Sequence, residues 1–200
     1  MFHDISVILV DKIGELGYIG IFFLMFLESS FFPFPSEIVM IPAGYLAYKG
    51  EMNIYLALFA GVSGSLTGAL FNYYLALHFG RSFLLRFGKY MFLKPESLYK
   101  LESFFANHGE ISTFNGRLIP GIRQYISFPA GLAKMNLFRF SLYTSFGALL
   151  WLIVLVLLGY FLGANQALID KYLHTAVIAL LVFVGVCTLV YILYKRQKTK

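Results

Sequence analysis

Four charged residues lie in segments that are otherwise strongly apolar: Glu28, Glu37, Arg117 and Arg123. Burial raises the pKa of a carboxylate and a neighbouring arginine lowers it, so a glutamate held between these influences can take up and release a proton. Arginine stays charged and presents a planar fork of donors that suits phosphate. The residues predict proton coupling at Glu28 and Glu37 and binding of a phosphate group at Arg117 and Arg123. A purely structural ion-pair network is the alternative.

The segments that carry these charges are interrupted apolar stretches, 16–48 and 114–133. Charges at membrane depth are tolerated where protein or a water-filled cavity covers them, and proline breaks helices. Each stretch is therefore expected to form a re-entrant hairpin rather than two complete spans. The expected hairpin breaks are Pro33, Pro35, Pro42 and Gly44 in the first stretch and Pro120, Pro129 and Gly131 in the second.

The two interrupted stretches match each other at a constant offset. Ile41-Pro42-Ala43-Gly44 recurs as Phe128-Pro129-Ala130-Gly131, with an offset of 129 − 42 = 87. One long apolar stretch follows each of them. A hairpin crosses no membrane and a span crosses once, so the second unit is predicted to be inverted relative to the first, as in many transporters. If the hairpins enter from opposite faces, the acids of the first face the arginines of the second.

Composition identifies the environment of these elements. Of 200 residues, 59% are hydrophobic and only 13% are charged, and the mean hydropathy is +0.74. This excludes a disordered chain, and the single cysteine excludes a disulfide scaffold. The stretches 52–80, 140–169 and 172–194 are long enough to cross a bilayer. The predicted fold is an all-α integral membrane protein with two inverted repeats, each a re-entrant helical hairpin plus one transmembrane helix, and an extra C-terminal transmembrane helix.

A single membrane domain, 1–200, is expected, and the distribution of charge orients it. Most of the basic residues fall on one side of the predicted membrane, which places that side and the C-terminus in the cytoplasm. The predicted parts are an amphipathic N-terminal helix (1–15), repeat 1 (16–79), a basic cytoplasmic segment (80–103), repeat 2 (104–163), the C-terminal transmembrane helix (172–194) and a basic tail (195–200).

Several function classes lack support in the sequence. The net charge of +6 is explained by topology signals and does not indicate nucleic acid as a partner. The four histidines show no metal-ligand spacing. No nucleophile elbow, phosphate-binding loop or HExxH motif is present. No metal, no cofactor and no enzymatic activity are therefore expected.

Two longer motifs resemble a known family. The first runs from Glu28 to Glu37 (ESSFFPFPSE) and is followed by Pro42-Ala43-Gly44. The second runs from Asn115 to Arg123 (NGRLIPGIR) and is followed by a second Pro-Ala-Gly. Both are similar to the signatures of the DedA family of bacterial membrane proteins, and the likeness covers roughly residues 15–165. One departure is Ala69, where many members carry an acid, so a role of that acid does not carry over.

The resemblance implies a multi-pass protein of the bacterial cytoplasmic membrane. The family is related to lipid-scrambling VTT-domain proteins, and its important acids and arginines match Glu28, Glu37, Arg117 and Arg123. The function expected from it is a proton-coupled translocase for phosphate-bearing lipids such as undecaprenyl phosphate or phosphatidylethanolamine. The expected partners are membrane lipids and protons, with a homo-oligomer possible. A proton-coupled exporter of small cationic solutes and a non-transporting membrane scaffold are the alternatives.

Overall fold

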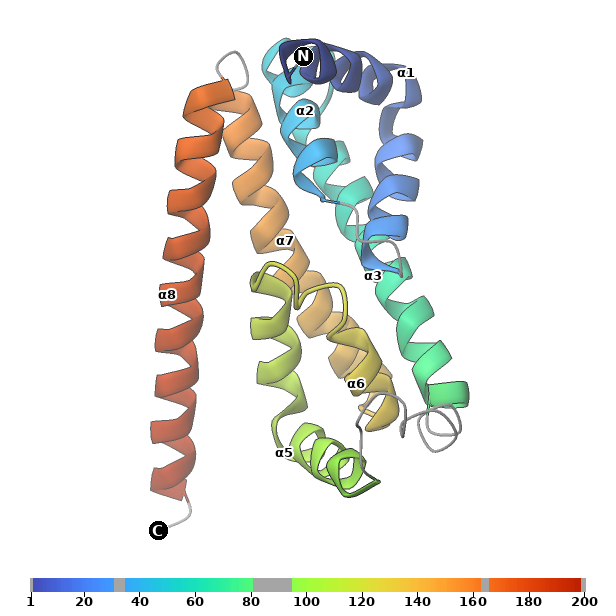
Figure 1. The fold of residues 1–200 in the computed structure, drawn as a ribbon, viewed down its shortest axis with the longest axis vertical. Coiled ribbons are helices and arrows are strands. Elements are labelled where there is room, and N and C mark those ends of the chain that lie inside the picture. The colour runs from blue at the N-terminus through green and yellow to red at the C-terminus, as the bar shows by residue number, and fades with distance from the viewer. Residues whose placement is uncertain (1, 31–34, 81–94, 163–165, 199–200) are drawn as a thin grey trace.

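The computed structural model describes residues 2–30, 35–80, 95–162 and 166–198, and within these ranges it contains helices and turns but no strand (Figure 1). The elements in chain order are α1 (Phe2–Ser29), α2 (Glu37–Tyr48), α3 (Ile54–Leu75), the π-helical turn η1 (Ala76–Gly80), α5 (Pro95–Leu118), α6 (Ser127–Leu132), α7 (Leu137–Leu162) and α8 (Gln166–Lys198). Pro33 and most of the predicted basic segment lie outside the described residues.

Three helices are long and apolar enough to cross a membrane: Ile54–Gly80, Leu137–Leu162 and Tyr172–Tyr194. They coincide with the three stretches predicted to span a membrane, except that the second helix is Leu137–Leu162 where the prediction was 140–169. Large hydrophobic side chains such as Phe59, Phe146 and Val182 are exposed on the surface of the bundle. Contiguous apolar surface of this kind is stable only when lipid covers it.

The two interrupted segments fold into pairs of antiparallel arms. α1 kinks at Gly17, whose φ of 59° is allowed for glycine but unfavourable for other residues. Beyond the kink α1 descends to Ser29, and α2 returns towards the end of the molecule where it began; α5 and α6 approach from the opposite end, so the two tips lie at mid-height (Figure 1). The 12 residues of α2 extend only about 18 Å, less than the roughly 30 Å of a hydrocarbon core.

The structure corrects the predicted positions of the breaks. Pro35 and Pro120 lie in the connections between arms, as expected, but Pro42 and Gly44 lie inside α2, and Pro129 and Gly131 lie inside α6. Pro129 is the third residue of its helix, where the backbone N–H would have no intrahelical partner. Pro42 sits in the second turn of α2, at the cost of one hydrogen bond.

The glycines of the two repeated motifs serve close packing instead. A Cβ on Gly44 would lie 2.2 Å from the carbonyl oxygen of Val156 in α7, and a Cβ on Gly131 would lie 2.3 Å from that of Tyr73 in α3. Each short return arm therefore packs directly against the backbone of the long span that follows the other hairpin. In the same way, Gly64 and Gly68 of α3 allow close approach of α1, as their helical spacing suggests.

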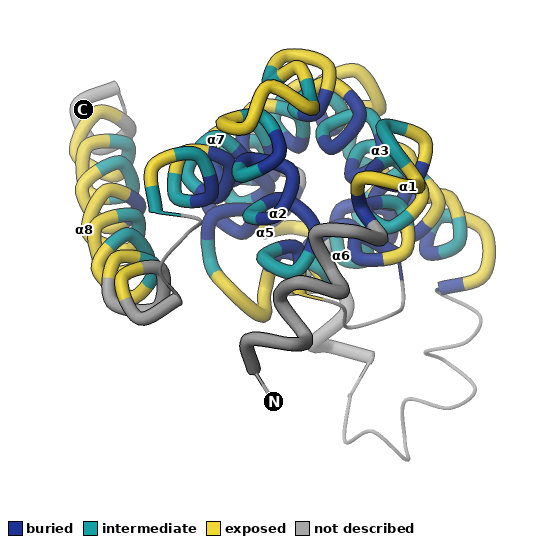
Figure 2. Tube along the Cα trace, turned by 90° about the horizontal axis from the view of Figure 1, so that it is seen from above, coloured by how far each residue is buried: buried dark blue, intermediate teal, exposed yellow. Residues whose placement is uncertain are grey.

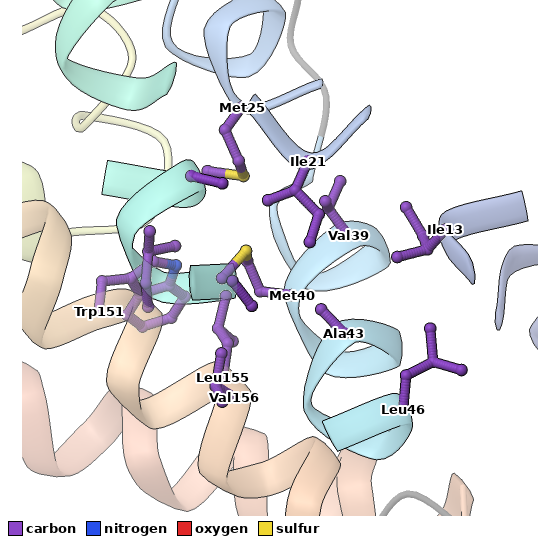
Figure 3. Packing of buried hydrophobic residues seen from close by; sticks show 13 residues of the cluster. Ile13, Ile21, Met25, Val39, Met40, Ala43, Leu46, Trp151, Leu155 and Val156 are labelled. Carbon is purple, nitrogen blue, oxygen red and sulfur yellow. The ribbon is translucent and has the colours of Figure 1, made fainter. Parts of the chain in front are cut away.

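A continuous core joins the first hairpin to α7. Met25, Val39 and Met40 from the hairpin pack with Trp151 and Leu155 of α7, and all five are buried (Figure 3). α8 packs against the outside of this core through the partly buried Leu173, Val177 and Leu180, and it is mostly exposed along its length (Figure 2). The core thus fixes the first tip against α7, while α8 contributes little to positioning it.

Candidate functional site

The four predicted site residues meet where the two tips face each other. Glu28 is the second-last residue of α1 and Glu37 is the first of α2, while Arg117 is the second-last of α5 and Arg123 lies in the connection to α6. Glu28, Arg117 and Arg123 are buried, at 2%, 3% and 6% exposure, and Glu37 is half-buried. The cluster balances formally, with two acids and two arginines.

Arg123 pairs with both carboxylates. Its Nε lies 3.2 Å from Oε1 of Glu28, and its Nη2 lies 3.4 Å from Oε1 of Glu37. The Nη2–Glu37 contact has hydrogen-bond geometry. The Nε–Glu28 contact does not, so Nε and Oε1 retain unfilled hydrogen-bonding capacity. A single arginine from the second hairpin therefore connects the two arms of the first.

Arg117 makes a different set of contacts. Its Nη1 donates to Oγ of Ser29 at 3.3 Å, and its Nη2 donates to Oγ of Ser127 at 3.1 Å. The Ser29 hydroxyl in turn donates to Oε2 of Glu28 at 2.7 Å. Arg117 thus reaches the acid through a hydroxyl, whereas Arg123 contacts it directly. The two arginines are not equivalent, although their sequence contexts are alike.

Trp151 of α7 forms one wall of the site. The guanidinium carbon of Arg123 lies 4.9 Å from the centroid of the Trp151 ring, which is a cation–π arrangement. Trp151 Nε1 donates to Oγ of Ser36 at 3.0 Å. The indole therefore holds the start of α2 on one side and the guanidinium on the other.

The side chain of Asn72 in α3 caps the C-terminal end of α1. Its Nδ2 donates to the carbonyl oxygens of Ser29 and Ser30, at 3.1 and 2.8 Å. The last carbonyls of a helix have no intrahelical partners, so this side chain supplies a donor that the buried helix end requires. Asn72 fixes the position of the Glu28–Ser29 pair relative to the spanning helix.

Unfilled donors remain at the centre of the cluster. Arg117 Nε and Arg123 Nε and Nη1 are buried without a hydrogen-bond partner, as is Oε1 of Glu28. A cavity of about 10 Å³ beside them is lined by both arginines, Glu28, Ser65 and Trp151, among others. It has room for about one water molecule. The geometry therefore offers unsatisfied guanidinium donors next to a carboxylate, in a cavity with no space for a ligand larger than a water molecule.

Within the described residues, no group of three His, Cys, Asp or Glu side chains is arranged to hold a metal ion. Sequence reasoning missed the contributions of Ser29, Ser36, Ser127 and Trp151. Ser29 adjoins Glu28, and Trp151 belongs to a stretch that resembles the family. Nevertheless, their contacts join elements far apart in the chain, and single-sequence periodicity gives no sign of them.

These observations define a multi-pass helical membrane protein with a buried charge cluster where two broken helical segments meet. Residues 34–161 match the family model for the VTT domain. The chain belongs to this family, the DedA family of bacterial membrane proteins.

Three relatives illustrate the family. "Uncharacterized membrane protein YkoX" of Bacillus subtilis is 40% identical, covering 96% of this chain and 85% of the relative. "Undecaprenyl phosphate transporter A" of Bacillus subtilis is 31% identical, covering 92% and 90%. "Protein DedA" of Escherichia coli is 28% identical, covering 93% and 89%. No solved structure matches the chain significantly. The relatives' names point to a family of membrane transporters rather than enzymes.

Proposed function

We propose that this protein moves phosphate-bearing lipids, such as undecaprenyl phosphate or phosphatidylethanolamine, between the leaflets of the bacterial cytoplasmic membrane. The observation that carries the proposal is the pair of buried arginines at the meeting point of the hairpin tips, with donors that no protein group fills. A relative with 31% identity is named as an undecaprenyl phosphate transporter. A phosphate head group suits these donors, and the lipid tails remain in the surrounding hydrocarbon.

The arrangement of helices suits alternating access. α1 packs on α3 and α2 on α7, while α5 packs on α7 and α6 on α3. Exchanging α1, α2 and α3 for α5, α6 and α7 reproduces these four packing relationships. We take the halves to be inverted repeats with re-entrant hairpins, and the short arms support this. Each tip can then open towards one leaflet while the other stays closed.

Proton binding provides a way to open the cluster. With both acids ionised, Arg123 is held by two carboxylates, and the four charges sum to zero. Protonation of Glu28 or Glu37 weakens this hold and leaves a net positive charge, which favours entry of a phosphate. Because the closed cavity holds only about one water, the tips must separate for the head group to bind. Proton uptake and phosphate binding would then favour the same open state.

The test is leaflet exchange in proteoliposomes. Labelled undecaprenyl phosphate and labelled phosphatidylethanolamine are compared with undecaprenol, which has a tail but no phosphate, with and without a pH gradient. We expect exchange of at least one phosphate-bearing lipid, faster with the gradient, and none of undecaprenol above protein-free vesicles. The Glu28→Gln and Glu37→Gln variants should lose the response to the gradient.

Other outcomes would contradict the proposal. Equal exchange of undecaprenol would remove the role of the arginines in recognising phosphate. If the folded protein exchanges no lipid, the remaining candidate functions are an exporter of small cationic solutes and a non-transporting scaffold. An exporter should depend chiefly on the two glutamates, whereas a scaffold should tolerate neutralisation of all four residues while it remains folded.

A further inference from the structure

A second polar pocket lies far from the tips, at the end of the bundle where α6 ends, α7 begins and the C-terminus lies (Figure 1). Its volume is about 430 Å³, within the range of small-molecule sites. α5 contributes His108 and Glu110, the connection before α7 contributes Lys134 and Asn136, and α7 contributes Arg139 and Tyr143. None of these residues belongs to the central cluster.

The charges in this pocket leave one cation available. Arg139 Nη1 contacts Oε1 of Glu110 at 2.6 Å, and the Tyr143 hydroxyl donates to Oε2 of Glu110 at 3.1 Å. Glu110 thus neutralises Arg139. Lys134 is exposed and has no ion-pair partner in the described part of the chain. The pocket therefore carries an excess positive charge, which indicates an anionic ligand.

The backbone at Lys134 is unusual. Lys134 is the only residue other than glycine with positive φ in the described ranges, at 51°. It follows α6 at the left-handed position of a helix-ending motif, where Lys134 N–H donates to Gly131 O and Met135 N–H to Ala130 O. Glycine or asparagine is favoured there, because this conformation is unfavourable for other residues. A lysine at this position indicates a use for its side chain.

The surroundings indicate that the ligand is a lipid. Arg139 is the third residue of the α7 span, which places the pocket near the membrane surface. Tyr191 of the peripheral helix α8 lines one side, and the apolar Phe105 and Met135 line another. Because α8 packs loosely and is mostly exposed, tails bound here can extend along it into the bilayer.

We propose that this pocket is a second site, which binds the phosphate head group of a membrane lipid through Lys134 at the membrane surface. Arg139, held by Glu110, supplies further donors to the same phosphate. The inference goes beyond the proposed transport site and does not depend on it, because the two clusters share no residue. Where transport at the tips also holds, the pocket is suited to holding lipid before it enters.

Lipid binding to the full-length protein in detergent, followed by native mass spectrometry, tests this site. The probes are dioctanoyl phosphatidic acid, dioctanoylglycerol without phosphate, and inorganic phosphate. The main variant is Lys134→Gly, because glycine keeps the left-handed backbone and removes the side chain that carries the ammonium group. Lys134→Asn is a second variant compatible with that backbone. The matched control is Lys49→Ala, an exposed lysine that pairs weakly with Glu51 near the opposite end.

We expect the wild type to bind phosphatidic acid more tightly than either other probe. Both Lys134 variants should lose about tenfold in affinity, the usual size of one charge-assisted contact, with no fall in the unfolding temperature. Lys49→Ala should bind as the wild type does, and Arg123→Ala should retain the Lys134-dependent binding even if transport fails. Unchanged affinity in the Lys134 variants, or equal binding of dioctanoylglycerol, would overturn the proposal. Tighter binding of inorganic phosphate would contradict its assignment to a lipid.

Discussion

The two hairpins share packing positions and differ in charge. Gly44 and Gly131 occupy equivalent places in the repeated motif, and each lies against the backbone of a long span. Glu28 and Arg117 lie at the same distance from the end of the first helix of each hairpin, each as the second-last residue, yet they carry opposite charges. The shared glycines allow close packing in both hairpins, and the opposite charges form a buried, formally neutral cluster between the tips.

The return arms differ as well. α2 has 12 residues and is followed by Gly50 with a φ of 78°, whereas α6 has only six and is followed by Lys134 in the left-handed conformation. After α2, the residue with positive φ is a glycine, which adopts this conformation without strain. After α6 it is a lysine, and the polar pocket lies beside it. Both hairpins therefore need a glycine for packing, Gly44 or Gly131, whereas only the second has Lys134 beside a polar pocket.

The largest effect on stability is expected when the charge balance between the hairpins is broken. Arg123→Ala removes the partner of both acids and leaves Glu28 buried without a direct counter-ion, which should cost about 4 kcal/mol. Glu28→Ala should cost less, because Arg123 keeps Glu37. The double variant Glu28→Ala with Arg123→Ala should lose less stability than the sum of the two single changes. Chemical unfolding in detergent measures all three, and additive effects of the two single changes would contradict direct pairing.

A smaller loss should follow from changes at the shared glycines. Gly44→Ala and Gly131→Ala each place a methyl group closer to a backbone carbonyl oxygen than van der Waals contact allows, which should destabilise by about 3 kcal/mol through overpacking. Gly185→Ala in α8 is the control, since nothing lies within 4 Å of its added Cβ. Thermal unfolding should show similar losses for the first two and none for the third. A large loss at only one motif would argue against equivalent packing of the hairpins.

The smallest effect concerns the hydroxyls that hold Arg117. Ser29→Ala removes the link between Arg117 and Glu28, and Ser127→Ala removes only a terminal contact. Hydrogen bonds to charged groups contribute about 2 kcal/mol, so Ser29→Ala should cost at least this much and more than Ser127→Ala. Ser63→Ala is the control, because its hydroxyl bonds only to Ala60 O within its own helix. Equal stability of the Ser29→Ala and Ser127→Ala variants would contradict a stabilising link from Arg117 through the Ser29 hydroxyl to Glu28.

The sequence predicted much of this molecule and missed identifiable parts. Charged residues in apolar segments indicated Glu28, Glu37, Arg117 and Arg123, because charge in a membrane needs a partner. Which arginine pairs with which acid could not be predicted, since it depends on the turns between α5 and α6. The positions of Pro42 and Pro129 were misjudged: Pro129 lies in the first turn of α6, where proline is tolerated, and α2 continues through Pro42 with the loss of one backbone hydrogen bond. The role of Lys134 depends on a backbone conformation that residue type alone does not show.

The measurement that tests the central claim most directly is the rate of undecaprenyl phosphate exchange by Arg123→Ala and Arg123→Lys in proteoliposomes, relative to wild type. Arg123→Lys keeps the charge but loses the planar donor fork. If Arg123 binds the lipid phosphate, the wild type exchanges the lipid, Arg123→Ala is no faster than protein-free vesicles, and Arg123→Lys is strongly slowed. Wild-type rates from both variants, with the protein folded, would contradict the claim that the facing tips carry the lipid phosphate.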